Sequence, residues 1–168
     1  MKITFRDVHA GFLKGINFFI GFLLAVIVII VFGNVLSRYV LNVSLAWSEE
    51  VSRTLFIWMA FLGAITAYIN NEHLGLDIVV KIFPKKITQL LIIIADIVVF
   101  FALAIVLKGG IDMTVDSFES GWVSSAVPIP YGYIYLVVPI SAALMLIECT
   151  LKFINDIQMA VRLSKGGA

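Results

Sequence analysis

The sequence predicts an all-α integral membrane protein with four transmembrane helices, both termini in the cytoplasm and amphipathic extensions at the membrane surface. Hydrophobic residues make up 61% of the chain and charged residues only 14%, a composition from which a water-facing surface cannot be built. Each bilayer crossing takes roughly 20 apolar residues, so a chain of this length has room for about four spans and short loops. We therefore expect a single membrane domain over residues 1–168.

The first two apolar runs predict spans over residues 16–36 and 48–69. The first run follows a basic segment, as in a secretory signal, but it is longer than a signal's apolar region and lacks a small-x-small cleavage site. The second run is too short to cross alone, so its helix must extend backward through Glu49, Glu50 and Arg53. This helix therefore enters the membrane as an amphipathic element and then becomes apolar on all sides.

The other two spans are predicted over residues 87–107 and 134–154. Helical periodicity in the third run continues through Ile111, Val115 and Phe118, so we expect this helix to project beyond the bilayer. The fourth run follows a turn between two prolines. Its start carries three tyrosines typical of a membrane interface, Tyr131, Tyr133 and Tyr135.

The distribution of Lys and Arg predicts the orientation of the four spans. With the N terminus inside, Arg38, Arg53 and Lys108 are the only basic residues outside. The other nine are then cytoplasmic, namely Lys2, Arg6, Lys14, Lys81, Lys85, Lys86, Lys152, Arg162 and Lys165. Because basic loop residues favour the cytoplasmic side of a membrane, the count predicts that both termini lie inside.

Asp96 lies near the middle of the third predicted span, where an ionisable side chain is costly and is therefore a candidate for function. One interpretation is a proton or cation relay. The other is that a neutral or hydrogen-bonded Asp96 fixes helix packing, because no basic residue of this chain is expected at a comparable depth. A partner subunit can also supply a counter-group. Glu148 is expected near the inner surface, roughly 20 Å from the outer start of its span, and not beside Asp96.

The sequence contains no constellation for enzymatic chemistry. His9 and His73 lie outside the predicted spans, so they cannot hold a haem between helices. Cys149 is the single cysteine, which excludes an intrachain disulfide and a thiol pair. The sequence also lacks a Ser-His-Asp arrangement, a phosphate-binding loop and an HExxH motif. We therefore expect no catalytic residue, no metal site and no cofactor.

Small residues on the first two spans have the spacing that allows two helices to approach closely. The pairs are Gly21 with Ala25, Ala60 with Ala64, and Gly63 with Ala67. They have two interpretations of equal weight. Either they pack the four helices together, or they dock a larger membrane partner.

Charged and aromatic residues gather at the outer ends of the second and third spans. Interfacial charges beside Trp47 and Trp58 fix the depth and rotation of a helix, although the Glu49–Arg53 pair contributes only about 0.3–0.5 kcal/mol. Continuation of the third helix would also create one acidic stripe, which is either a solvated face or a docking surface for an extracytoplasmic protein. The stripe consists of Asp112, Asp116 and Glu119.

One run of residue types is unusual for the flank of a span. It comprises Asn34, Ser37-Arg38-Tyr39, Asn42, Ser44, Trp47-Ser48-Glu49-Glu50 and Arg53, followed by Trp58 and Gly63-Ala64. Further along come His73, Asp77 and the segment Ser125-Ala126-Val127-Pro128-Ile129-Pro130. On these residues, and over essentially its whole length, the chain resembles the small, DctQ-like membrane subunit of tripartite ATP-independent periplasmic (TRAP) transporters.

This resemblance implies a multi-pass protein of the bacterial inner membrane. It implies two partners, a large multi-span subunit on a separate chain and a soluble periplasmic substrate-binding protein. The large subunit would carry the substrate and sodium sites, while the small subunit widens the static scaffold. The cargo would be an organic acid such as a C4-dicarboxylate or sialic acid, with general similarity favouring sialic acid.

The resemblance also implies roles for individual residues. Residues at the periplasmic surface would anchor the second helix and take part in receiving the binding protein. They are Arg38, Tyr39, Trp47, Glu49, Glu50 and Arg53. His73 and Asp77 would lie along the inner membrane surface and serve a structural role.

Two hypotheses of function follow from the sequence. The first is an accessory scaffold subunit of a sodium-driven TRAP transporter. The second is an autonomous four-span, proton-coupled carrier in which Asp96 is the coupling carboxylate. A membrane enzyme is a third hypothesis, but it would need a metal or a nucleophile that the sequence does not supply.

Overall fold

Four long helices form the molecule in a computed structural model, which describes residues 5–70, 85–124 and 126–165. They are α1 (Phe5–Leu36), α2 (Ala46–Ile69), α4 (Lys85–Glu119) and α6 (Val137–Lys165). A π-helical turn, η1 (Ser37–Leu41), extends α1, and the short helix α5 (Tyr131–Tyr135) precedes α6. All four long helices have the length and hydropathy needed to cross a membrane, which confirms the predicted fold class.

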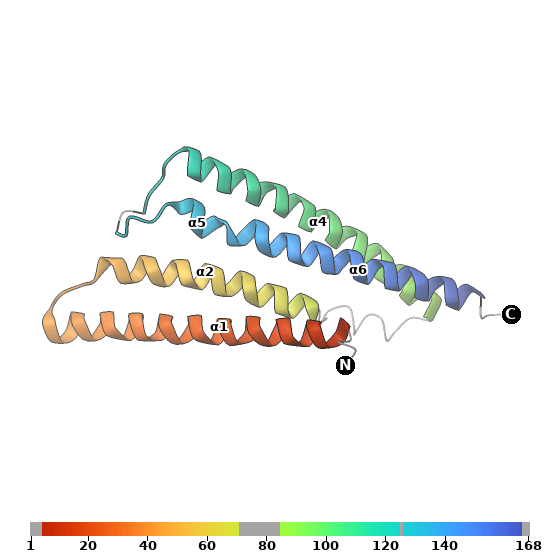
Figure 1. The fold of residues 1–168 in the computed structure, drawn as a ribbon, viewed down its shortest axis with the longest axis horizontal. Helices are drawn as coiled ribbons and strands as arrows, with labels where there is room; N and C mark the ends of the chain where they lie inside the picture. The colour runs from red at the N-terminus through yellow and green to blue at the C-terminus, as the bar shows by residue number, and fades with distance from the viewer. Residues whose placement is uncertain (1–4, 71–84, 125, 166–168) are drawn as a thin grey trace.

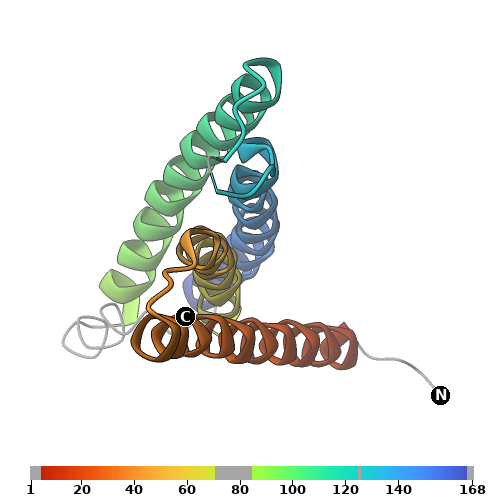
Figure 2. The same ribbon diagram turned by 90° about the vertical axis from the view of Figure 1, so that its left-hand side faces the viewer.

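The helices pair as two antiparallel hairpins, α1 with α2 and α4 with α6 (Figure 1). The hairpins meet where α2 packs beside α6, and within the described residues α1 contacts neither α4 nor α6. The spatial order is therefore α1–α2–α6–α4, and Figure 2 shows α1 and α4 inclined away from the two central helices. This arrangement is open, because its first and last helices do not meet to close a bundle.

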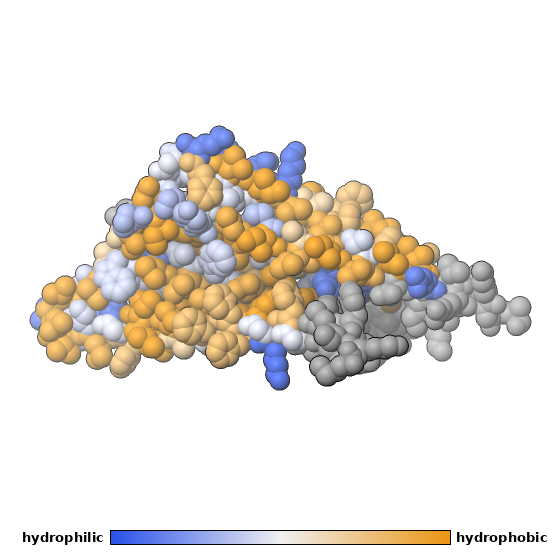
Figure 3. Space-filling model, in the orientation of Figure 1, coloured by the Kyte–Doolittle hydropathy of each residue, from blue (hydrophilic) through white to orange (hydrophobic). Residues whose placement is uncertain are grey.

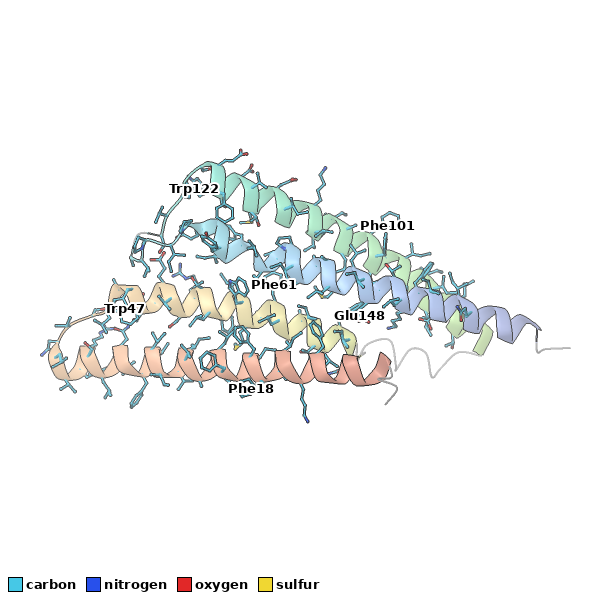
Figure 4. All side chains as sticks on the ribbon, viewed as in Figure 1. Phe18, Trp47, Phe61, Phe101, Trp122 and Glu148 are labelled. Carbon is cyan, nitrogen blue, oxygen red and sulfur yellow. The ribbon has the colours of Figure 1, made fainter. Side chains whose placement is uncertain are left out.

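Such an open arrangement encloses little apolar volume. Few of the described hydrophobic side chains are buried, and these lie mostly on the two central helices. They are Leu23, Ile65, Tyr68, Ile134, Val137, Ala142 and Cys149. Large apolar side chains such as Phe18 and Phe101 point away from the helices (Figure 4), as expected where lipid or another protein covers the surface.

We call the two ends of the molecule the turn end, where α1 leads into α2, and the terminal end, where α1 begins and α6 ends (Figure 1). The helix α4 continues to Glu119, so the prediction that it extends past Gly110 is confirmed. The helix carrying the fourth span starts earlier than the predicted span, because α5 already begins at Tyr131. Which side of the membrane each end occupies stays a prediction.

Candidate functional site

The turn between α1 and α2 is built by polar residues of the run that resembles TRAP small subunits. Asn34 of α1 reaches across the turn, where its Oδ1 accepts a 3.0 Å hydrogen bond from the N–H of Leu45 at the start of α2. The Ser37 hydroxyl donates to the carbonyl of Val43 at 3.0 Å. Asn42 adopts the left-handed conformation with φ of 54°, which Asn tolerates better than most residues. These residues therefore set the direction in which α2 leaves α1.

Asn34→Ala is expected to lower the stability of the protein by about 1 kcal/mol, because it leaves the Leu45 N–H without its acceptor. Asn17→Ala is the matched control, since Asn17 is exposed on the same helix. Thermal unfolding of both variants in detergent measures the difference. Equal unfolding temperatures for the two variants would contradict the role given to Asn34.

Glu50 joins the two hairpins at the turn end. Its Oε2 accepts a 2.9 Å hydrogen bond from the backbone N–H of Ala126, and its Oε1 accepts one of 3.2 Å from the Tyr131 hydroxyl. Arg53, one helical turn further along α2, adds favourable charge beside the carboxylate. We call Glu50, Ala126 and Tyr131 the turn-end junction. It connects two segments that carry the family resemblance and lie more than seventy residues apart in the sequence.

The connection between α4 and α5 presents these groups to Glu50. The Ser124 N–H donates to the Ile129 carbonyl at 3.1 Å, and the Tyr131 N–H donates to the Trp122 carbonyl at 2.9 Å. Gly132 lies against the ring of Phe118, where an added Cβ would come within 2.6 Å of the ring atoms. This close approach holds the end of α4 on α5.

The other predicted residues at the turn end are not brought together. Arg38, Tyr39, Glu49 and Arg53 are exposed, and among the described residues Glu49 and Arg53 form no ion pair. Trp47 lies at the turn end of α2 (Figure 4) and is largely exposed, whereas Trp58 is half-buried. Their roles in anchoring α2 stay predictions. The sequence singled out Glu50 and Arg53 together, but in the structure it is Glu50 that forms the hydrogen bonds between the two hairpins.

A second polar group joins three helices toward the terminal end. The Cys149 thiol of α6 points at the backbone carbonyl of Asp96 on α4, with 3.7 Å between sulfur and oxygen. The Tyr68 hydroxyl of α2 makes a hydrogen bond with the Cys149 side chain. The Asp96 carboxyl, on a residue only 7% exposed, lies close to Lys152 and Asp156 of α6. We call these five residues the terminal-end junction.

The terminal-end junction corrects one expectation about Asp96. The expectation that no basic residue of the chain lies at a comparable depth was wrong, because Lys152 follows Cys149 by less than one helical turn and its charge acts on Asp96. The sequence placed Lys152 at the inner end of its span, but α4 and α6 are antiparallel and bring the two positions side by side. Glu148 directly precedes Cys149, whose thiol contacts Asp96, so it lies at nearly the same height as Asp96 and not closer to the terminal end as expected. Both the relay and the packing interpretation of Asp96 stay predictions.

The two junctions lie the same number of residues apart on both central helices. Glu50 and Tyr68 on α2 are 18 residue steps apart, about 27 Å along a helix, and so are Tyr131 on α5 and Cys149 on α6. This equal spacing means that α2 and α6 run parallel and in register. Between the junctions, Phe61 of α2 lies toward α6 (Figure 4), and the buried residues of the two helices include the polar Ser52, Thr66 and Ser141.

The predicted small-residue pairs do not pack the helices of this chain against one another closely. A Cβ added at Gly21 or Gly63 would have no neighbouring atom within 4 Å, and Ala25 is exposed while Ala67 is half-buried. The close approach occurs instead at Gly110, whose Cβ would lie 3.0 Å from Val138 and 3.1 Å from Pro139. A docking role for the small residues therefore stays a prediction.

The predicted acidic stripe lies on one exposed face of α4. Asp112, Asp116 and Glu119 are all exposed near its turn end. Asp116 and Glu119 also border a hollow of about 520 Å³ that Trp122 and Tyr135 help to line. The predicted residues His73 and Asp77 lie outside the described part of the chain.

A smaller hollow of about 310 Å³ lies beside Asp96 on the surface of α4 and α6. Its lining is apolar and comes mainly from Ile97, Phe100, Phe101 and Phe153. No group of His, Cys, Asp and Glu within the described residues has the arrangement of a metal site. The arrangement as a whole can join helices and present surfaces to other molecules.

Comparison with known families settles the relationship. Residues 27–159 match the model of the DctQ component of tripartite ATP-independent periplasmic transporters. The chain belongs to this family. It is therefore a component of a transporter and not an enzyme, and it is a multi-pass protein of the bacterial inner membrane. The resemblance drawn from the sequence is confirmed.

Individual relatives agree with the family. A putative TRAP transporter small permease protein of Haemophilus influenzae is 37% identical over 52% of this chain, and the match spans 54% of that protein. A second small permease protein from the same species is 27% identical over 79% of each chain. The isethionate TRAP transporter permease protein DctMQ of Oleidesulfovibrio alaskensis is 30% identical over 87% of this chain but only 23% of its own length.

Proposed function

We propose that this DctQ-family chain is the small scaffold subunit of a sodium-driven transporter that takes up organic acids. A large membrane subunit on a separate chain would carry the cargo and ion sites. The matched region makes up only 23% of the DctMQ relative, so that protein has a long further segment on the same chain. This fusion supports a fixed association between a DctQ-like part and a larger permease part.

The open helix order is the observation that carries the scaffold proposal. Because α1 and α4 do not meet, no ring of helices within the described residues surrounds a path through the membrane. The faces of the arrangement expose large apolar side chains along every long helix. A carrier that worked alone would need a second copy to build such a path, whereas a scaffold subunit needs only faces that a partner can cover.

The proposed cargo is suggested by the names of relatives, and the proposed soluble partner is suggested by the charges at the turn end. Relatives from Vibrio cholerae are named as small permease proteins of C4-dicarboxylate and sialic acid TRAP transporters, so we propose an organic acid of these classes. A periplasmic binding protein would deliver it. If the turn end is periplasmic, as the Lys and Arg count predicts, the exposed stripe of Asp112, Asp116 and Glu119 faces that partner.

Copurification tests the proposed association. The tagged chain, coexpressed with the large permease subunit of its own transporter, is expected to copurify with that subunit in equal amounts from detergent. An unrelated four-span protein with the same tag is the control. Recovery of the tagged chain without the large subunit, from membranes that contain both, would contradict the proposal.

Asp96→Asn separates the scaffold from the autonomous carrier. The scaffold proposal predicts that uptake by the complete transporter falls at most modestly, in step with any loss of assembly, because Asp96 joins helices and carries no coupling ion. Uptake of labelled sialic acid and succinate by cells, corrected for the amount of assembled complex, measures this effect. Complete loss of uptake with normal assembly would favour the proton-coupled carrier.

A further inference from the structure

The exposed apolar bands of the outermost helices α1 and α4 do not lie at the same height in the molecule. Contacts near the turn end define one reference zone, which spans seven residue steps or about 10 Å along the helices. These are the bond between Asn34 and Leu45, the bond between Glu50 and Tyr131, and the contact of Phe118 with Tyr133, whose ring centroids are 5.2 Å apart. If the membrane plane were perpendicular to the helices, all of these contacts would lie at a similar depth in it.

The two helices differ in opposite ways around this zone. On the π turn that follows α1, Tyr39, Val40 and Leu41 lie further from the terminal end than this zone. They are 81%, 71% and 68% exposed, and all three are large and apolar or aromatic. On α4, Lys108 and Asp112 are exposed although they lie on the terminal-end side of this zone. In Figure 3 hydrophobic colour predominates over the turn end of α1, with some hydrophilic patches, whereas hydrophilic colour gathers at the turn end of α4.

The terminal end shows the same displacement independently. The contact of Asp96 with Cys149 gives a reference height there, and Tyr68 adjoins it. Counting along both helices from the bond between Asn34 and Leu45 places Lys14 of α1 on the turn-end side of Tyr68 of α2, and Lys14 is nevertheless exposed. On α4, Leu90 and Ile94 are exposed although they lie beyond Asp96 toward the terminal end. At both ends the apolar band of α4 is shifted toward the termini relative to that of α1.

We propose that lipid hydrocarbon crosses the molecule obliquely, so that the spans step toward the terminal end in the order α1, α2, α6, α4. Counting residues from these two references at 1.5 Å per residue gives a displacement on the order of 20 Å between α1 and α4. A perpendicular membrane would place the Lys108 and Asp112 charges in hydrocarbon and the Tyr39–Leu41 turn in water. The oblique position avoids both costs, and Arg38 on the same π turn is long enough to extend its charged end to the lipid headgroups.

The oblique position has a consequence for the surfaces available to partners. The last turns of α4, from Lys108 to Glu119, stand in water beside the membrane, while the turn after α1 stays immersed in lipid. A soluble protein that approaches the turn end would therefore meet the end of α4 before it meets the turn between α1 and α2.

Spin labels on the complete transporter in phospholipid vesicles test this position. The background is Cys149→Ser, or Cys149→Ala if the serine variant does not assemble. Single cysteines at Val40, Asp112, Lys14 and Leu90 carry the label. Collisions with oxygen, which concentrates in lipid, are compared with collisions with a water-soluble nickel chelate.

Labels at Val40 and Leu90 are expected to have an oxygen-to-nickel collision ratio several-fold higher than labels at Asp112 and Lys14. The opposite ratio at Val40 or Asp112 would overturn the proposal, because it would describe a perpendicular membrane. A label at Val40 that neither reagent reaches would also overturn it, since the large subunit and not lipid would then cover that turn.

Discussion

Gly110→Leu is expected to separate α4 from α6 and to destabilise the protein by about 1–3 kcal/mol, the usual range for overpacking a tight contact. Even a Cβ at this position would lie 3.1 Å from the backbone nitrogen of Pro139. The proline ring and the helix backbone cannot rotate away as a long side chain can. Assembly with the large subunit is expected to fall with stability, because the α4–α6 hairpin would no longer present one fixed surface.

Gly109→Leu is the matched control, since a Cβ at Gly109 has no neighbour within 4 Å and the residue is exposed. Both substitutions bring the same gain in helix propensity, about 1 kcal/mol for replacing glycine. The control is therefore expected to be neutral or slightly stabilising, so the two variants should shift the unfolding temperature in opposite directions. A Gly110→Leu protein as stable as the control would show that α4 and α6 are not packed as described.

Glu50→Ala is expected to reduce uptake several-fold by loosening the joint between the two hairpins. The substitution removes the acceptor for both the Ala126 N–H and the Tyr131 hydroxyl, which are the hydrogen bonds that tie α2 to the start of α5. Tyr131→Phe removes one of the two bonds and should have a smaller effect. Uptake per assembled transporter and the yield of copurified large subunit are the measurements.

Glu49→Ala is the control for Glu50, because it removes the neighbouring carboxylate from an exposed position with no hydrogen bond across the hairpins in the described part of the chain. Glu50→Ala together with Arg53→Ala should resemble Glu50→Ala alone. If Glu49→Ala and Glu50→Ala reduced uptake equally, the net charge of the turn end and not the junction would explain the effect.

The sequence predicted the helices better than the contacts between them. Each span could be read because apolar runs of this length have few alternatives to a membrane helix. The backward extension of the second span through Glu49 and Glu50 was also readable, since its apolar run alone was too short. Whether the helices closed into a bundle or stayed open was not readable, because lipid-facing and protein-facing positions carry the same apolar residue types.

The two junctions show why contacts within the site were harder to predict. The sequence singled out both Glu50 and the segment before α5. No local sequence pattern could predict a contact between them, because the two residues that meet are 76 positions apart. Lys152 and Asp156 were assigned to the end of their own span, and only the antiparallel register of α4 and α6 places them beside Asp96. The close contact at Gly110 could have been suspected from Gly109-Gly110 inside a helical pattern, since such glycines often have a packing role.

The most direct test of the scaffold function is reconstitution of purified components into vesicles with an inward sodium gradient. Vesicles that contain this chain alone are expected to accumulate no labelled sialic acid, succinate or isethionate. Vesicles that also contain the large subunit, supplied with the periplasmic binding protein, are expected to accumulate one of them. Accumulation against a gradient by this chain alone would contradict the account.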